Sequence, residues 1–122
     1  RGQATRYAAC GVVATTRLDV NGTVRRLLEA RRASFAPMDD AVAMSGMEYG
    51  GITPVGLPDD WALYLDPRVA ALPVAIVGSG IRASKLRLPG SVIAALPRAE
   101  VIEGLAADAP AAEPPVPPAL PA

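Results

Sequence analysis

The sequence of 122 residues is 51% apolar and 20% charged, a composition typical of one soluble globular domain large enough to bury a core. No stretch approaches the roughly 18 consecutive apolar residues of a membrane-spanning helix, which excludes a membrane span. With one cysteine and no histidine, these residues also lack the means for an internal disulfide, a Cys/His zinc site, a Ser-His-Asp triad or a Cys-His dyad.

Charge is zero overall but unevenly placed along the chain. Residues 1–36 carry seven arginines against two acidic residues, a net charge of +5, and residues 37–122 carry −5. A basic end on a neutral protein favours a phosphate-bearing partner, although arginines that contact only solvent explain it equally well. The sequence starts at Arg1 rather than at a methionine, which predicts that further sequence precedes it.

The first predicted element is a short buried strand within residues 6–15. Cys10 lies in it, and its expected role is that of a small buried hydrophobic side chain. Asp19 then has the position of an N-cap, and the spacing of Val20, Val24 and Leu27 predicts one apolar face of a helix. The arginines on or just beyond the later turns of this helix are Arg25, Arg26, Arg31 and Arg32. Cations are favoured at a helix C-terminus, and contact with phosphate is an equally weighted alternative.

A second helix is predicted after Pro37, preceded by a short strand at residues 33–36. Asp39 and Asp40 fall in its first turn, where the helix dipole stabilises acidic side chains. Adjacent residues point in different directions on a helix, so this interpretation outweighs a catalytic or metal-binding pair of carboxylates. Gly46 is placed to end the helix as the residue after the C-cap.

The stretch from Gly46 to Pro58 is the most unusual part of the sequence. It contains four glycines and two prolines in thirteen residues, which is incompatible with a helix or a regular strand. A single turn needs fewer such residues. Because glycine lets other atoms approach the backbone closely, this stretch predicts a backbone-lined wall for a small ligand; a long surface loop is the alternative.

The rest of the chain predicts short strands alternating with short helices. We expect strands at residues 61–65, 74–77, 84–88 and 101–102, a helical turn after Pro67, and a helix ending before Pro97. The strand at 74–77 is expected to be buried and the strand at 84–88 half exposed. Between them, residues 78–82 form a second glycine-rich turn, which lacks the pattern of a dinucleotide- or phosphate-binding loop.

Proline and alanine dominate the end of the sequence. Six of the 13 prolines fall in residues 108–122, which predicts a polyproline-prone, disordered tail. We therefore expect a folded domain over residues 1–106 and a tail over residues 107–122.

Three segments in this order resemble a known family. The stretch Gly46–Gly56, the strand and turn Ile76–Arg82 and the helix Leu88–Leu96 are similar to those of YbaK-type aminoacyl-tRNA deacylases, free-standing relatives of the editing domain in bacterial prolyl-tRNA synthetases. The resemblance covers roughly residues 6–105. Its best mark is a GxxxP element, matched by Gly50 and Pro54.

The resemblance implies a fold, an activity and a set of partners. The fold is a compact single α/β domain, with short helices around a mixed, barrel-like sheet. The activity is trans-editing: hydrolysis of the ester in mischarged aminoacyl-tRNA, with tRNA-Pro carrying alanine, cysteine or serine as the expected substrate and no metal or organic cofactor. The expected partners are the 3′ acceptor end of the tRNA and prolyl-tRNA synthetase, not DNA or a membrane, and the expected location is the cytoplasm.

The resemblance also assigns roles to residues. The catalytic element is the loop from Gly50 to Pro54, whose backbone groups hold the ester. The expected substrate-binding residues are Met47, Gly51, Ile52, Thr53, Gly56, Gly78, Ser79, Gly80 and Arg82, and the candidates for tRNA phosphate are the four arginines named above. The family commonly places a lysine of an early strand near the substrate; the only lysine here is Lys85.

Backbone groups can support this chemistry without a strong protein nucleophile. An activated ester needs orientation and stabilisation of the developing oxyanion, which amide N–H groups supply, while water, a tRNA hydroxyl or the substrate's own thiol acts as base or nucleophile. A catalytically inactive tRNA- or nucleotide-binding module of the same fold is the alternative. An adaptor acting through the proline-rich tail is a third interpretation.

Overall fold

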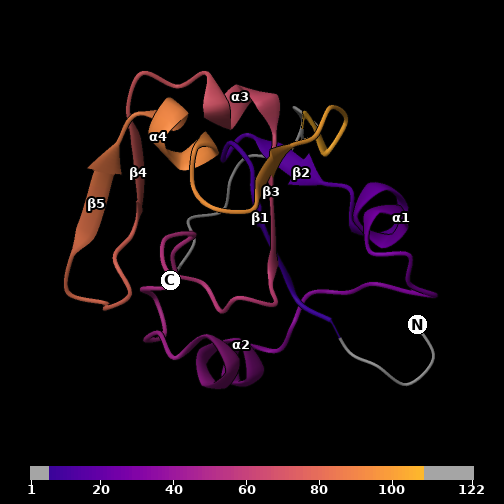
Figure 1. Ribbon diagram of the computed structural model, residues 1–122, viewed down its shortest axis with the longest axis horizontal. Helices are drawn as coiled ribbons and strands as arrows, with labels where there is room; N and C mark the ends of the chain where they lie inside the picture. Colours follow the sequence, from indigo (N-terminus) through magenta and orange to yellow (C-terminus); the bar gives the residue numbers. More distant parts are fainter. Residues whose placement is uncertain (1–5, 109–122) are drawn as a thin grey trace.

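The computed structural model describes residues 6–108, a mixed α/β domain built on three small sheets (Figure 1). The central sheet is parallel and has the order β1 (Ala8–Gly11), β3 (Ala62–Leu65) and β6 (Ala99–Val101). Parallel neighbours need crossover connections, and the long segments between these strands supply them. The mixed α/β class expected from the sequence is confirmed.

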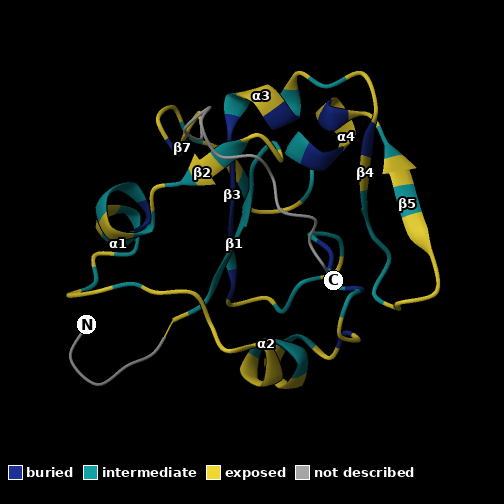
Figure 2. Cartoon of the chain, turned by 180° about the vertical axis from the view of Figure 1, so that it is seen from behind, coloured by how far each residue is buried: buried dark blue, intermediate teal, exposed yellow. Residues whose placement is uncertain are grey.

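Strand β3 lies in the middle of the domain and separates two cores. Its side chains alternate between the faces of the sheet: Leu63 and Leu65 belong to one buried cluster, and Tyr64 belongs to the other. Leu65 has no solvent exposure at all, and Figure 2 shows β3 as a buried strand through the centre of the molecule. The aromatic stretch before residue 66 thus forms the central strand.

Two short helices cover the first core. In this cluster α3 (Pro67–Ala70) contributes Val69, and α4 (Gly90–Ala94) contributes Ile93. Asp66 caps α3, since its carboxylate accepts the amide N–H of Arg68 at 2.7 Å. Both helices begin at or next to a proline, a residue that is favoured at the start of a helix.

The second core lies under the first helical segment. Val24 and Leu105 are buried there against Tyr64. The helix opens with a wide π-helical turn, Val20–Val24, and continues as α1 (Arg25–Leu27). Asp19 caps it as expected, and hydrogen bonds from the Thr23 side chain and amide hold the pKa of Asp19 below its usual value.

The remaining elements lie at the periphery. An antiparallel hairpin, β4 (Ala75–Gly78) and β5 (Lys85–Leu88), lies to one side of the central sheet. Strand β2 (Thr16–Leu18) pairs antiparallel with β7 (Ala106–Asp108). The helix α2 (Met38–Ser45) ends at Gly46, which has a left-handed φ of 74° as the C-terminal glycine predicts.

Several details differ from the expectations. No strand forms at residues 33–36, and the strand at 74–77 is not buried throughout, because Ile76 is 63% exposed and only Ala75 is buried. Strands β2 and β7, which pair with each other, were not expected. Strand β7 extends the fold through residues 107 and 108, and the remainder of the predicted tail lies outside the described residues. Within residues 6–108 the three sheets do not close into the barrel-like sheet that was expected.

Candidate functional site

The two glycine-rich segments predicted from the sequence lie against each other, joined by their backbones. The N–H of Gly80 donates to the carbonyl of Gly51 at 2.7 Å, and the N–H of Glu48 donates to the carbonyl of Gly80 at 3.0 Å. The Glu48 carboxylate adds a third link by accepting the N–H of Arg82 at 2.7 Å. The GxxxP loop and the turn of the β4–β5 hairpin therefore form one structure.

The GxxxP loop and the hairpin turn lie so close together that two of their glycines have no room for a side chain. A Cβ on Gly51 would lie 2.5 Å from the carbonyl carbon of Ile81, and a Cβ on Gly78 would lie 2.5 Å from the carbonyl oxygen of Ile52. Real Cβ atoms do not come this near to backbone atoms. These two glycines are therefore required for the contact between the segments rather than for an unusual φ.

Gly50 has a different reason to be glycine. The N–H of Gly51 closes a turn by donating to the carbonyl of Glu48 at 2.8 Å, which puts Gly50 at the third position. Its φ of +82°, next to a Tyr49 with negative φ, is that of a type II turn, where glycine is strongly favoured. Gly50 thus shapes the first half of the GxxxP loop.

The underside of the loop is supported by buried residues. Met47 and Thr53 are 8% and 4% exposed, and the Met47 sulfur accepts the N–H of Thr53 at 3.4 Å. On the hairpin side, the Ser79 hydroxyl is placed to donate to the carbonyl of Ile81 at 3.2 Å, and it lies 2.7 Å from the Ser84 hydroxyl, with which it shares a hydrogen bond. Met47, Thr53 and Ser79 therefore hold the two segments in shape.

Two amide groups of the loop point to a binding function. In the described part of the chain, the N–H groups of Gly50 and Ile52 donate to no protein acceptor. The N–H and C=O of one trans peptide point in opposite directions. Since the Gly51 carbonyl faces Gly80, the N–H of Ile52 is turned away from the hairpin. Such amides are suited to hold a carbonyl oxygen that develops negative charge.

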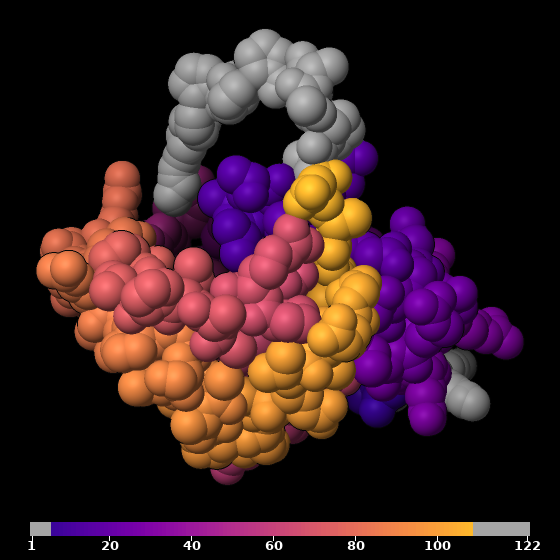
Figure 3. Space-filling view, turned by 90° about the horizontal axis from the view of Figure 1, so that it is seen from above, coloured from indigo at the N-terminus to yellow at the C-terminus, as the bar shows by residue number. Residues whose placement is uncertain are grey.

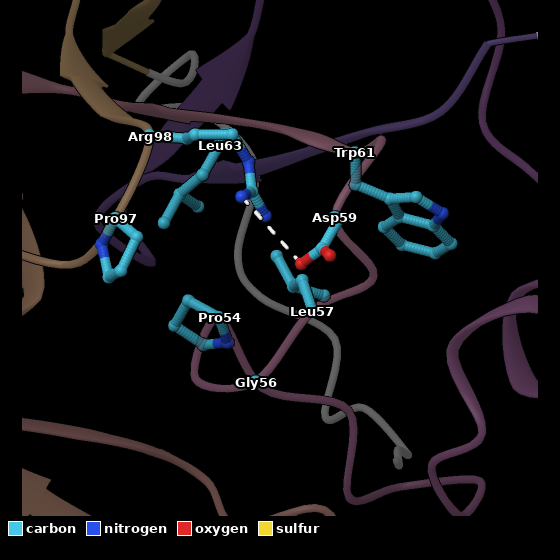
Figure 4. Close-up of a pocket in the computed structure, with 8 residues that line it drawn as sticks. All are labelled: Pro54, Gly56, Leu57, Asp59, Trp61, Leu63, Pro97 and Arg98. Carbon is cyan, nitrogen blue, oxygen red and sulfur yellow. Dashed lines mark ion pairs between the residues drawn. The ribbon is translucent and has the colours of Figure 1, made fainter.

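A small cavity adjoins the other end of the loop (Figure 4). Its volume is about 210 Å³, and Pro54 and Gly56 form part of its wall. The other lining residues are Leu57, Asp59, Trp61, Leu63, Pro97 and Arg98. Arg98 has a left-handed φ of 66° and donates to the carbonyl of Pro58 at 3.2 Å. Arg98 was not predicted to lie here, because it reaches this place from a loop that is distant in the sequence.

The four candidate arginines are not at this site. Arg25 and Arg26 lie on α1, which is on the side of the central sheet opposite the hairpin (Figure 1). In the view from above, the C-terminal end of the described chain, drawn in yellow, lies between the region of α1 and the hairpin (Figure 3). Arg31 and Arg32 line a separate groove of about 930 Å³, together with the 75% exposed Phe35. The structure thus joins the two glycine segments but leaves the arginines apart from them.

No metal centre or reactive thiol is evident in the described chain. Within residues 6–108 no group of three or more His, Cys, Asp or Glu side chains lies together in a way that could hold a metal ion. None of the helices described there has the length and apolar character needed to span a membrane. Burial raises the pKa of Cys10 to about 11. A thiol with such a pKa stays protonated at neutral pH and is a poor nucleophile.

This pKa gives a testable expectation for Cys10. At pH 8, iodoacetamide should alkylate the native protein about 10²-fold more slowly than the urea-unfolded protein, because only the thiolate reacts and an unfolded thiol has a pKa of about 8.5. The native rate should rise about tenfold per pH unit between pH 8 and 10. Mass spectrometry of quenched samples measures both rates; equal rates in the native and unfolded protein would contradict the raised pKa.

Solved structures share this fold. A scaffold protein from computational epitope grafting is 26% identical with a TM-score of 0.66, covering 77% of this chain and 61% of its own. A protein proposed to be a trans-editing enzyme for prolyl-tRNA synthetase is 26% identical with a TM-score of 0.64, covering 75% of this chain and 57% of its own. A hypothetical protein is 21% identical with a TM-score of 0.68, and the match covers 79% of this chain and 62% of that protein. At this identity the similarity shows only that the two proteins share a fold.

The chain therefore spans only about three fifths of the length of these solved relatives. No curated protein matches its sequence at a significant level. The sequence profile of the aminoacyl-tRNA editing domain matches residues 1–96, which include both glycine segments and the hairpin. The resemblance found in the sequence is confirmed: the chain belongs to the aminoacyl-tRNA editing domain family.

Proposed function

We propose that this protein is a trans-editing deacylase, which hydrolyses the ester between a wrong amino acid and the 3′ end of tRNA. One observation carries the proposal: the GxxxP loop is fastened to the hairpin turn by backbone hydrogen bonds, while the N–H groups of Gly50 and Ile52 stay free within the described chain. Pre-oriented amides of this kind stabilise the charge that develops on an ester carbonyl oxygen.

The proposed reaction needs no side-chain nucleophile. A water molecule attacks the ester carbonyl carbon, and the oxyanion that forms is held by the two free amides. The bond from this carbon to the ribose oxygen then breaks, the ribose oxygen takes a proton, and the products are a free amino acid and uncharged tRNA. The neighbouring ribose hydroxyl is suited to assist the attacking water as a base. The loop contributes orientation and electrostatic stabilisation, the two effects that contribute most to such reactions.

The size of the nearby cavity favours a small amino acid. In our proposal its side chain lies against Pro54, in the cavity of about 210 Å³ whose lining includes the buried residues Trp61 and Leu63. Alanine, cysteine and serine fit such a space. The similarity to the proposed trans-editing enzyme for prolyl-tRNA synthetase supports tRNA-Pro as the carrier and that synthetase as a partner. In this proposal the protein works in the cytoplasm.

The remaining predicted residues have supporting roles in this proposal. Gly56, Gly80 and Arg82 lie beside the terminal adenosine or its phosphate. The arginines of α1 and of the larger groove contact phosphates farther along the acceptor stem; they are Arg25, Arg26, Arg31 and Arg32. The folded domain carries the activity, and residues 109–122 are dispensable for it.

Hydrolysis of charged tRNAs tests the proposal. Alanyl-, cysteinyl-, seryl- and prolyl-tRNA with the proline anticodon are incubated with the protein and with a Gly50→Val variant, whose side chain opposes the φ of +82° at this position. We expect release of one wrong amino acid by the parent, retention of prolyl-tRNA, and a loss of about 10²-fold in the variant. Binding of tRNA without release would favour the inactive binding module, and neither binding nor release would refute the family function here.

A further inference from the structure

Lys85, which neither segment of the predicted site contains, reaches the GxxxP loop. It is the first residue of β5 and the only lysine of the chain. Its Nζ donates to the carbonyl of Gly50, 35 residues earlier, at 3.1 Å. In the hairpin Lys85 pairs with Gly78, the residue whose backbone lies against Gly51 and Ile52. The register of β4 and β5 therefore places this ammonium group beside the loop.

The hairpin thus holds two successive carbonyl groups of the loop. Lys85 binds the oxygen of Gly50, and the N–H of Gly80 binds the oxygen of Gly51. The N–H of Gly51 is also engaged, since it donates to Glu48. The peptide between Gly50 and Gly51 is consequently fixed at both of its polar ends.

This peptide lies between the two that carry the free amides. The N–H of Gly50 belongs to the peptide before it, and the N–H of Ile52 belongs to the peptide after it. A peptide unit is planar, so the direction of each free amide depends only on the φ and ψ angles on either side. Glycine at positions 50 and 51 leaves these angles unusually free, and hydrogen bonds from outside the loop must restrict them.

We propose that Lys85 is a positioning residue for the editing reaction: it fixes the Gly50–Gly51 peptide and thereby aims the free amides of Gly50 and Ile52 at the ester. The proposal rests on the proposed function for its catalytic consequence. Its structural part, the restraint of the loop by a side chain of β5, is independent of that function. A charge-assisted hydrogen bond suits this task, because it is stronger than a neutral one.

The neighbouring charges supply a control. Arg87 lies two residues along β5, is also exposed and carries the same charge, and its side chain makes no hydrogen bond within residues 6–108. The Glu48 carboxylate accepts the Arg82 amide N–H, so this charge already has a partner on the hairpin. Replacing Arg87 therefore removes a positive charge from the same strand without removing a contact to the GxxxP loop.

The test compares Lys85→Met, Lys85→Arg and Arg87→Met with the parent. For Lys85→Met we expect kcat to fall about tenfold, the effect of losing one exposed charge-assisted hydrogen bond, with KM changed less than about twofold. Lys85→Arg should recover most of the rate, and Arg87→Met should keep it. Amide hydrogen exchange of residues 48–53 should be faster in Lys85→Met alone, and thermal unfolding confirms that each variant is folded.

The outcomes separate this inference from the proposed function. If the parent edits and Lys85→Met edits equally well, with unchanged exchange, the positioning role is refuted while the deacylase remains. A different result is that Lys85→Met raises KM and weakens the dependence of KM on salt concentration, while kcat and amide hydrogen exchange stay unchanged. In that case Lys85 binds phosphate, and the inference is again refuted. If the parent does not edit, the exchange rates still decide whether Lys85 restrains the loop.

Discussion

Replacing Gly51 by alanine is expected to lower the rate of deacylation by about 10²-fold, with the domain still folded. The added Cβ would lie 2.5 Å and 2.6 Å from the carbonyl carbon and oxygen of Ile81. Both of these are backbone atoms, so no side chain can rotate away, and the loop must move off the hairpin. That movement breaks the bond from Gly80 to the Gly51 carbonyl and changes the direction of the Ile52 amide. Single-turnover hydrolysis of the substrate identified for the parent measures the loss.

Two further variants make this expectation specific. Gly78→Ala disturbs the same contact from the hairpin side, because its Cβ would lie 2.5 Å from the carbonyl oxygen of Ile52. This variant should lose activity to a similar extent. Gly104→Ala is the control, because residue 104 has a φ of +79° and open space around its Cβ position. It should cost about 1 kcal/mol of stability from backbone strain and leave the rate unchanged. Full activity of Gly51→Ala would show that the contact between the segments has no part in the reaction.

Local chemistry made much of the fold predictable. Asp19 was recognisable as a helix cap and Gly46 as a C-terminal glycine, because a cap depends on short-range hydrogen bonds and the residue after a helix on a left-handed φ. The alternation of charged and apolar residues in β5 likewise predicted a half-exposed strand, which is confirmed. Features of this kind depend on a few adjacent residues and little on the rest of the chain.

Elements that depend on distant partners were harder to predict. Residues 74–77 are apolar and were expected to be buried, yet the β4–β5 hairpin has no third strand over it in the described chain, so Ile76 remains exposed. Strand β7 consists of two alanines and an aspartate, a composition with weak strand preference. It forms because β2 pairs with it and Arg68 binds Asp108 at 2.7 Å.

The candidate site shows the same division. The glycine and proline content of residues 46–58 predicted a backbone-lined wall, and residues 78–82 were recognised as a second turn. The two segments are about thirty residues apart in the sequence, so their contact could not be predicted. In the structure the backbone of each segment occupies the space that a side chain on a glycine of the other segment would need. The contacts of Glu48 and Lys85 with the loop and the hairpin were not predicted, because a charged residue near a loop is usually solvated. Only the hairpin register reveals the carbonyl and amide groups that they bind.

Leu65→Ala should be the most destabilising single change in the core. Leu65 is fully buried in β3, in one cluster with Val69 and Ile93. Truncating such a side chain costs about 2–5 kcal/mol, a large part of the roughly 5–15 kcal/mol that stabilises a small domain. The cavity would not close readily, because a methyl group of Leu65 packs against Gly11, which has no side chain to fill the space. A Cβ built on Gly11 would lie only 2.7 Å from that methyl carbon. Urea unfolding followed by circular dichroism measures the loss.

Val101→Ala is the matched control for Leu65→Ala. Val101 is the register partner of Leu65 on β6 but is 45% exposed, so the same measurement should give a loss below about 1 kcal/mol. Equal losses would show that β3 is not the centre of the core. The consequence for the site follows from Leu57 and Val77, which both pack against this cluster. One follows the GxxxP loop and the other precedes the hairpin turn, so the core that Leu65 fills also anchors both halves of the proposed editing site.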